Sequence, residues 1–285
     1  MSLSRPPVAV IPPPAPETPA SARGGWRPLY AQWPTLAALV VLVLGWFVVS
    51  EARWVSARVL PTPGSVLHAG VQIWTHQYGT ATLPVQAMIS SGRVLAGFSL
   101  ATVAGVLVGV LTALVPAVRY FTEPLLSFFR PVPAFAFITV LIVWLGIGEE
   151  PKITLVFIGV FAPMTVYTTS AMSAMPKDLG EAARSLGASP TQVLLRVRLV
   201  AALPDILAGM RVLLALAWTG VMGAELIAAT SGLGWMIWHG LRYLDTPVIF
   251  VGVITIAVIA GAMDALLASV SWRLVGSWAP RIRGI

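Results

Sequence analysis

Several ionisable side chains lie inside long apolar segments of this chain, where an unpaired charge is costly and therefore marks a candidate functional site. Glu225 and Arg93 fall at similar depths near one end of their segments, so we expect Arg93 to be the structural partner of Glu225. A gate element is a second interpretation. We favour both over substrate contact, because the negative charge of Glu225 would repel an anion. Arg211 and Asp264 each lie roughly seven residues from the opposite end, which predicts a second pair that compensates both charges.

Patterns that support catalysis are absent from the sequence. There is no Gly-x-x-x-x-Gly-Lys-Ser/Thr run, no serine nucleophile with a placed histidine, and no carboxylate pair arranged for acid–base chemistry. No cysteine is present, so disulfides and thiolate metal sites are excluded. His68, His76 and His239 are too scattered for a metal site, and we expect them outside the bilayer. We therefore expect that this chain is not an enzyme and that it binds no cofactor or metal.

A polar interruption over 181–189 is a different kind of candidate, because it separates two long apolar segments. Asp178 and Glu181 have the spacing of an N-cap and a carboxylate at the third helical position, which predicts a short helix that starts at Leu179. Gly187 is suited to end that helix, since glycine adopts the left-handed backbone of a helix C-terminus at little cost.

A second helix is predicted directly after Gly187. Ser189 is a suitable N-cap, Pro190 fits the first turn, and Gln192 completes a capping box. We expect two short helices that meet at a sharp bend and lie along the membrane surface. An ordinary amphipathic linker at the interface has the same spacing, so this alternative stays open.

The elements that hold these residues are expected to be membrane helices. The chain is 57% hydrophobic and only 10% charged, whereas soluble domains have about 25% charged residues. Because a bilayer core needs about 20 apolar residues per helix, we predict six spans and leave five or seven open. Pro131 and Pro133 precede the third of them and favour a kink there. The predicted spans are 34–51, 90–115, 131–147, 152–173, 204–228 and 247–270.

Lysine and arginine placement predicts the orientation. With the N-terminus inside, eleven basic residues fall on cytoplasmic segments and five on the outer side, so both termini are expected in the cytoplasm. The net charge of +7 is explained by this bias, so we expect no nucleic acid partner. Residues 1–30 are rich in proline and alanine and predict a disordered cytoplasmic tail. The expected membrane domain is 31–275, with the polar loop at 176–200, and a cytoplasmic tail over 276–285. We expect the first span to be an uncleaved helix and not a secretory signal.

Small residues recur every four positions in the second span. Ala101, Gly105, Gly109 and Ala113 form one face that lets another backbone approach closely. Packing against a neighbouring helix of the same chain is the favoured interpretation, and a contact between two copies is the alternative.

Several motifs resemble one family. Glu181-Ala182-Ala183, Gly187, Val197 and Leu199 resemble the EAA loop of bacterial ABC importer permeases. The similarity extends over about residues 35 to 275 and points to the nitrate, sulfonate, taurine and bicarbonate branch. One departure is Val200, because the family usually has proline there, and we expect Pro204 to supply the helix start instead. The further motifs are Leu60-Pro61-Thr62-Pro63, Glu123-Pro124-Leu125-Leu126, Arg130-Pro131-Val132-Pro133, Trp144-Leu145-Gly146-Ile147-Gly148-Glu149, Leu203 to Arg211, Ala217-Trp218, Gly223-Ala224-Glu225 and Ser231-Gly232-Leu233-Gly234.

The resemblance implies an all-α membrane protein of about six transmembrane helices with a cytoplasmic coupling helix, the type I ABC importer permease fold. It implies a bacterial inner-membrane location among membrane lipids, two ATPase subunits that hold ATP and Mg, a second permease copy in a homodimer, and a periplasmic or lipid-anchored binding protein. The cargo would be a small organic or inorganic anion such as a sulfonate, taurine or nitrate. The residues implied to contact the ATPase are Glu181, Ala182, Ala183, Arg184, Leu186, Gly187, Ala188 and Ser189.

Three alternatives remain beside this interpretation. Related permeases move vitamin precursors or aromatic acids. A secondary transporter without an ATPase would show inverted repeats and ion-binding polar groups at mid-membrane, and the sequence shows no clear repeat and few such groups. A membrane scaffold without transport would not need the helix–glycine–helix loop.

Overall fold

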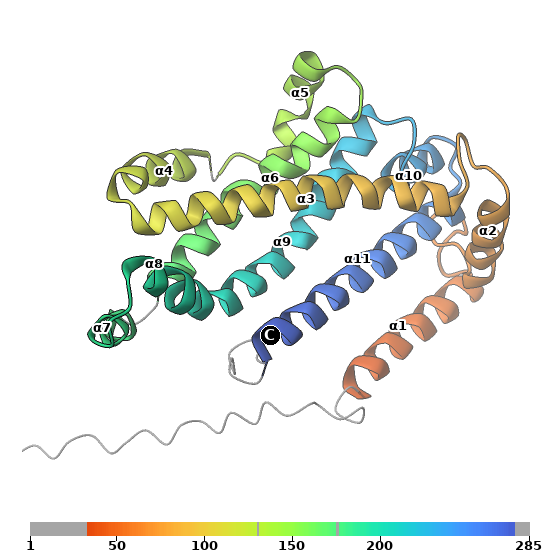
Figure 1. Ribbon diagram of the computed structural model, residues 1–285. Coiled ribbons are helices and arrows are strands. Elements are labelled where there is room, and N and C mark those ends of the chain that lie inside the picture. The colour runs from red at the N-terminus through yellow and green to blue at the C-terminus, as the bar shows by residue number, and fades with distance from the viewer. Residues whose placement is uncertain (1–32, 130, 175–176, 277–285) are drawn as a thin grey trace, which may run out of the picture.

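The structure, a computed structural model, describes residues 33–129, 131–174 and 177–276, and its elements within these ranges are all helices (Figure 1). The expected all-α fold is therefore confirmed. The tail predicted over 1–30, and the tail over 276–285 apart from Gly276, lie outside the described residues. In chain order the helices are α1 (Trp33–Glu51), α2 (Pro63–Thr75), α3 (Leu83–Leu114), α4 (Pro116–Phe129), η2 (Ala134–Phe137), α5 (Ile138–Leu145), α6 (Glu150–Ser173), α7 (Lys177–Ser185), α8 (Pro190–Gln192), η3 (Val193–Arg198), α9 (Leu199–Ala228), α10 (Leu233–Arg242) and α11 (Thr246–Val275).

The six apolar segments are all helical, but they do not form six long spans. The helices α3, α6 and α11 and the continuous helical run Pro190–Ala228 are long and apolar enough to cross a bilayer. α4 and the η2–α5 segment make a fifth span only if they are taken together, because they are bent by 87°. α1 is apolar over the shorter stretch Ala37–Glu51. The described residues thus hold four spans, or five with the bent pair, where the sequence predicts six.

Local backbone chemistry explains why the segment 131–147 is not a straight span. Pro133 precedes the 3₁₀ turn η2, and Gly146, with φ of 80°, ends α5. The eight residues of α5 reach only about 12 Å, which is far less than a hydrocarbon core of about 30 Å. The kink expected before this segment is therefore present, and the segment is too short to cross the bilayer by itself.

The core of the bundle lies where α3, α6 and α9 meet, and its valines and methionine are fully buried. The helices α3 and α6 approach each other closely, because a Cβ added at Gly105 would lie 2.8 Å from the Cβ of Met164, and one at Gly109 would lie 2.6 Å from the Cβ of Thr168. The small-residue face is therefore used within the chain, as favoured from the sequence. The core residues with no exposed surface include Val94, Val156, Val160, Met164 and Val221.

The helix α1 lies at the edge of the bundle and is exposed along most of its length. Trp46 connects it to the rest, because its Nε1 donates to the Pro61 carbonyl and its ring stacks on Phe250 with 5.6 Å between centroids. Gly45 has open space around it, with no heavy atom within 4 Å of an added Cβ.

The polar interruption begins with α7, which starts one residue before Asp178. Asp178 therefore lies in the first turn and is not the N-cap, so the predicted start at Leu179 is wrong. The C-terminus is as expected from Gly187, whose φ is 85°. The Ala188 N–H donates to the Ala183 carbonyl and the Gly187 N–H to the Arg184 carbonyl, which is the bonding pattern of a Schellman C-cap.

The second predicted helix starts where expected, but it does not end as a short helix. Ser189 and Gln192 form the predicted capping box, with Pro190 in the first turn. The helix then continues through a π-helical turn over Val193–Arg198 into α9, as one run of 39 residues. Val200 keeps a backbone N–H that a proline would lack, so nothing breaks the helix there. Pro204 lies buried inside α9 and does not start it.

Candidate functional site

Two ends of the bundle hold the residues of interest. The end with α2 and α10 is termed the α10 end, and the end with α7 and α8 is termed the α7 end; Figure 1 shows them on opposite sides of the molecule. Arg93 and Glu225 lie toward the α10 end, and the exposed loop 181–189 lies at the α7 end.

Arg93 of α3 and Glu225 of α9 meet in the interior. The Arg93 Nη1 donates to the Glu225 Oε1 at 2.7 Å and to the Ser231 carbonyl at 2.8 Å. Glu225 also accepts from the Ser90 hydroxyl at 2.8 Å and from the Gly234 N–H at 2.8 Å. The two charged side chains are 3% and 0% exposed. The structure thus brings this expected pair together and surrounds it with further donors.

Glu149, in the loop before α6, binds the other edge of the same guanidinium. The Arg93 Nη2 donates to its Oε1 at 2.7 Å and the Arg93 Nε to its Oε2 at 2.5 Å. The Lys152 ammonium donates to the same carboxylate at 3.2 Å. The hydrogen bonds from Arg93, with the charges of Arg93 and Lys152, lower the pKa of Glu149 to about 2. The sequence reasoning did not single out Glu149 as a partner, because nothing in a loop pattern indicates which helix it will meet.

The turn 231–234 closes this network over α3. The Gly232 N–H donates to the Gln86 side chain and the Leu233 N–H to the Ser90 hydroxyl. Gln86, Ser90 and Arg93 are spaced by four and three residues, so they share one face of α3. This polar face on an apolar helix is a signal from which Gln86 and Ser90 could have been found in the sequence.

Gly232 has the backbone that this closure requires. Its φ is 116° and its ψ is 164°, a conformation nearly restricted to glycine. An added Cβ would collide with the carboxylate oxygens of Glu225. Each nitrogen of the Arg93 guanidinium donates at least one hydrogen bond, and four of its five N–H groups are used within the described residues, so the cluster connects α3, α9 and the loops before α6 and α10.

Arg211 of α9 and Asp264 of α11 form the second expected pair. The Arg211 Nε donates to the Asp264 Oδ1 at 2.9 Å and its Nη2 to the Oδ2 at 2.7 Å. This pair differs from the first in burial, because the two side chains are 29% and 42% exposed. A two-bond ion pair in the middle of two spans is therefore partly open to whatever lies beside the chain.

The residues implied to contact an ATPase lie on a short exposed helix and the turn after it. Leu186 is 89% exposed, which is unusual for a large apolar side chain. Only Ala183 and Ala188 among the eight are partly covered. On the other face of α7, a Cβ at Gly180 would lie 3.7 Å from the Val193 side chain, so this face packs on the helix that leads into α9.

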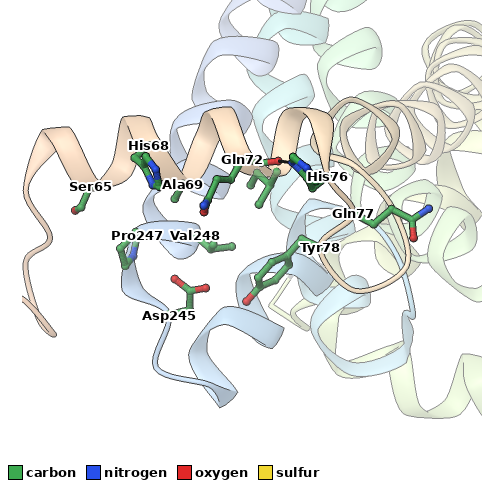
Figure 2. A pocket seen from close by; sticks show the side chains of 11 residues that line it. Ser65, His68, Ala69, Gln72, His76, Gln77, Tyr78, Asp245, Pro247 and Val248 are labelled. Atoms are coloured by element: carbon green, nitrogen blue, oxygen red, sulfur yellow. Dashed lines mark hydrogen bonds between the residues drawn. The ribbon is translucent and has the colours of Figure 1, made fainter.

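A pocket of about 570 Å³ with several polar lining residues lies at the α10 end between α2 and the start of α11. Figure 2 shows Tyr78 and Asp245 on one side of it and His68 and His76 on α2. Burial first, and then the neighbouring Asp245 carboxylate, raise the pKa of Tyr78 to about 12. Within the described part of the chain, no three histidine or carboxylate groups are placed to hold a metal ion.

The third histidine lies in an aromatic cluster beside this pocket. The His239 ring packs 4.8 Å from Trp235, 4.6 Å from Tyr243 and 5.3 Å from Tyr78 between centroids. His239 therefore contributes to packing at the α10 end and does not join the other two histidines at a shared site.

Comparison with known proteins supplies a family. Residues 102–283 match the model of the binding-protein-dependent transport system inner membrane component. The chain is 36% identical over 257 residues to the taurine transport system permease protein TauC of Escherichia coli (strain K12), covering 89% of this chain and 94% of TauC. It is 31% identical over 249 residues to the putative aliphatic sulfonates transport permease protein SsuC of Bacillus subtilis (strain 168), covering 87% and 89% of the two chains.

Among solved structures, a chain of the methionine ABC transporter MetNI in an inward-facing conformation matches with a TM-score of 0.55 at 22% identity. The match covers 66% of this chain and 95% of that one. At this identity the likeness supports the fold, which is that of an ABC importer permease.

Proposed function

The chain belongs to the binding-protein-dependent transport system inner membrane components, and on that premise we propose that it forms the path by which a small sulfonate of the taurine type is imported. The observation that carries this proposal is the 36% identity to TauC, which extends over 94% of that relative. The match to SsuC supports the same class of cargo. The protein is a multi-pass transport subunit of the inner membrane and not an enzyme.

The energy source is a separate ATPase, with ATP and Mg bound there and not on this chain. In our proposal two ATPase subunits dock on the exposed residues Glu181–Ser189 at the α7 end. The exposure of Leu186 supports this, because an apolar side chain that is 89% exposed offers area to a partner. The unbroken helix from Pro190 to Ala228 would carry a movement of α7 through the bilayer to the Arg93–Glu225 cluster.

The orientation and the remaining partners follow from the same proposal. The α7 end and both termini face the cytoplasm, as the distribution of basic residues favours. A binding protein, periplasmic or lipid-anchored, delivers the anion to the α10 end. A second copy of this chain completes the path.

Reconstitution tests this function directly. The permease, its ATPase and its binding protein would be placed in proteoliposomes, and uptake of labelled taurine would be measured with and without ATP. We expect uptake that needs all three components and ATP. Uptake driven by an ion gradient without the ATPase would instead support a secondary transporter, and accumulation of a vitamin precursor but no sulfonate would overturn the cargo assignment.

A further inference from the structure

The Arg211–Asp264 pair lies at mid-depth of two spans. Arg211 comes twelve residues after α9 begins at Leu199, and Asp264 comes eleven residues before α11 ends at Val275. At a rise of 1.5 Å per residue both lie about 17 Å along their helices from the α7 end. Both residues also lie inside the apolar segments 204–228 and 247–270, about seven residues from their ends, and at such positions a lipid-facing side chain meets no water.

The exposure of the pair is therefore informative. Side chains that are 29% and 42% exposed in the single chain would meet acyl chains if this face were turned to lipid. Ionisable residues within spans almost always face protein or a water-filled cavity, because hydrocarbon cannot solvate them. The face of α9 and α11 that carries the pair should accordingly be turned away from lipid.

The pair also has more unused binding capacity than the cluster around Arg93. Arg93 donates from all three guanidinium nitrogens and is 3% exposed. The Arg211 Nη1 has no hydrogen-bond partner within the part of the chain that the structure describes. Each Asp264 oxygen accepts a single hydrogen bond from Arg211, although a carboxylate oxygen can accept two. A cationic donor and an anionic acceptor thus remain available side by side.

Small residues leave room beside these charges. Gly261 and Ala265 flank Asp264 on α11, and Ala215 follows Arg211 by one turn on α9; all three are exposed. A Cβ added at Gly261 would meet no heavy atom within 4 Å. A small solute could therefore approach the pair from this side.

The geometry points to a charged substrate contact on the transport path, where Arg211 receives the sulfonate and Asp264 the ammonium group of a zwitterionic aminoalkanesulfonate. This inference rests on the proposed function and names the side chains that the cargo touches in transit. A zwitterion matches both halves of the pair, whereas an alkanesulfonate without an amine matches Arg211 alone.

Thiol labelling tests the first step without altering the pair, and the natural chain has no cysteine to interfere. Gly261→Cys and Gly45→Cys would each be assembled with the ATPase in membranes and treated with a charged methanethiosulfonate. Both glycines have open space for a Cβ, and Gly45 lies on the exposed helix α1. We expect Gly261→Cys to react at least tenfold faster than Gly45→Cys. Equal, slow reaction would overturn a water-facing path and would mean that lipid or a second copy covers this face.

Transport by two double variants tests the second step. Arg211→Met with Asp264→Leu removes both charges, and Arg211→Asp with Asp264→Arg exchanges them. We expect labelled taurine uptake to fall at least tenfold in both, while ATP hydrolysis stimulated by the binding protein stays within twofold of the natural protein. Ethanesulfonate uptake should fall less in the charge-free variant. If the exchanged pair restored taurine uptake, the pair would be structural only and the contact would be overturned.

These outcomes distinguish a failure of the inferred substrate contact from a failure of the proposed function. If the natural protein imported neither sulfonate, the proposed cargo would be wrong and the assigned contact would fall with it, while the labelling rates would still decide whether the face meets water. If the natural protein imported taurine and the charge-free variant did so equally well, only the contact would be overturned.

Discussion

Arg93 holds Glu149 by two hydrogen bonds, at 2.5 Å and 2.7 Å, although Glu149 lies in a loop and its side chain is 55% exposed. The same guanidinium binds the fully buried Glu225 through its remaining nitrogen. One arginine therefore connects the loop before α6 to the interior of α9. Arg93 is therefore the side chain that joins both carboxylates at the α10 end of the bundle.

Replacing Arg93 by methionine should destabilise the permease strongly. The substitution leaves Glu225 buried without its cation, and an uncompensated buried charge costs about 3–5 kcal/mol. Thermal unfolding in detergent, followed by fluorescence of the tryptophans, would measure this loss. We expect the double variant Arg93→Met with Glu225→Leu to be clearly more stable than Arg93→Met alone.

Arg119→Met is the matched control for this change. Arg119 pairs with Glu123 on α4, and the two side chains are 59% and 50% exposed. An exposed pair spaced by four residues contributes about 0.3–0.5 kcal/mol, so the control should unfold close to the natural protein. Equal effects of the two arginine substitutions would contradict the structural role of Arg93.

Acid should weaken the contact between Glu149 and Arg93 in a defined range. The pKa of Glu149 is about 2 in the folded protein, below its ordinary value of 4.5, because of the hydrogen bonds from Arg93. A lowered folded pKa stabilises the fold fully above the ordinary value, and this contribution is lost as the pH falls from about 4.5 toward 2. The unfolding temperature of the natural protein should therefore fall more over that range than that of Glu149→Gln. Parallel curves for the two proteins would refute this linkage.

Gly232→Ala should loosen the turn over α3. The conformation at φ 116° and ψ 164° costs a residue with a side chain about 1–3 kcal/mol, and the new methyl group would collide with Glu225. Gly45→Ala is the control, since its helical glycine has open space and alanine favours helices by about 1 kcal/mol. Unfolding temperatures should thus shift down for Gly232→Ala and not for Gly45→Ala.

The features that could be predicted from the sequence depend on local backbone chemistry or on the free-energy cost of burying a charge. The Ser189–Gln192 capping box and the end of α7 at Gly187 depend only on residues within a few positions, so the local sequence is enough to predict them. The Arg211–Asp264 pair could be predicted because each residue needs a counter-charge and both lie at a similar depth in their spans.

The features that were missed depend on tertiary surroundings. Glu149 meets Arg93 only because the chain folds back between α5 and α6, and no spacing in the sequence indicates that. Pro204 was expected to start a helix, but packed helices within a membrane tolerate an interior proline because neighbouring groups replace the lost hydrogen bond. The segment 131–147 does not form one straight span because the bend after α4 leaves α5 with only eight residues.

Leu186→Ser should impair docking of the ATPase and leave the permease itself intact. The side chain is 89% exposed, so its removal takes little from the fold, whereas a partner surface that covers it would lose burial of an apolar side chain worth about 1.5–3 kcal/mol. That loss predicts roughly a tenfold or greater decrease in affinity. Copurification with the ATPase and stimulated ATP hydrolysis would measure it, and the unfolding temperature of the isolated permease should stay unchanged. Leu244→Ser is the matched control for copurification, because Leu244 is 71% exposed at the opposite, α10 end, away from the proposed ATPase contact. Normal copurification of Leu186→Ser would exclude the tip of α7 from the contact, and an equal loss with Leu244→Ser would show that the effect is not specific to that end.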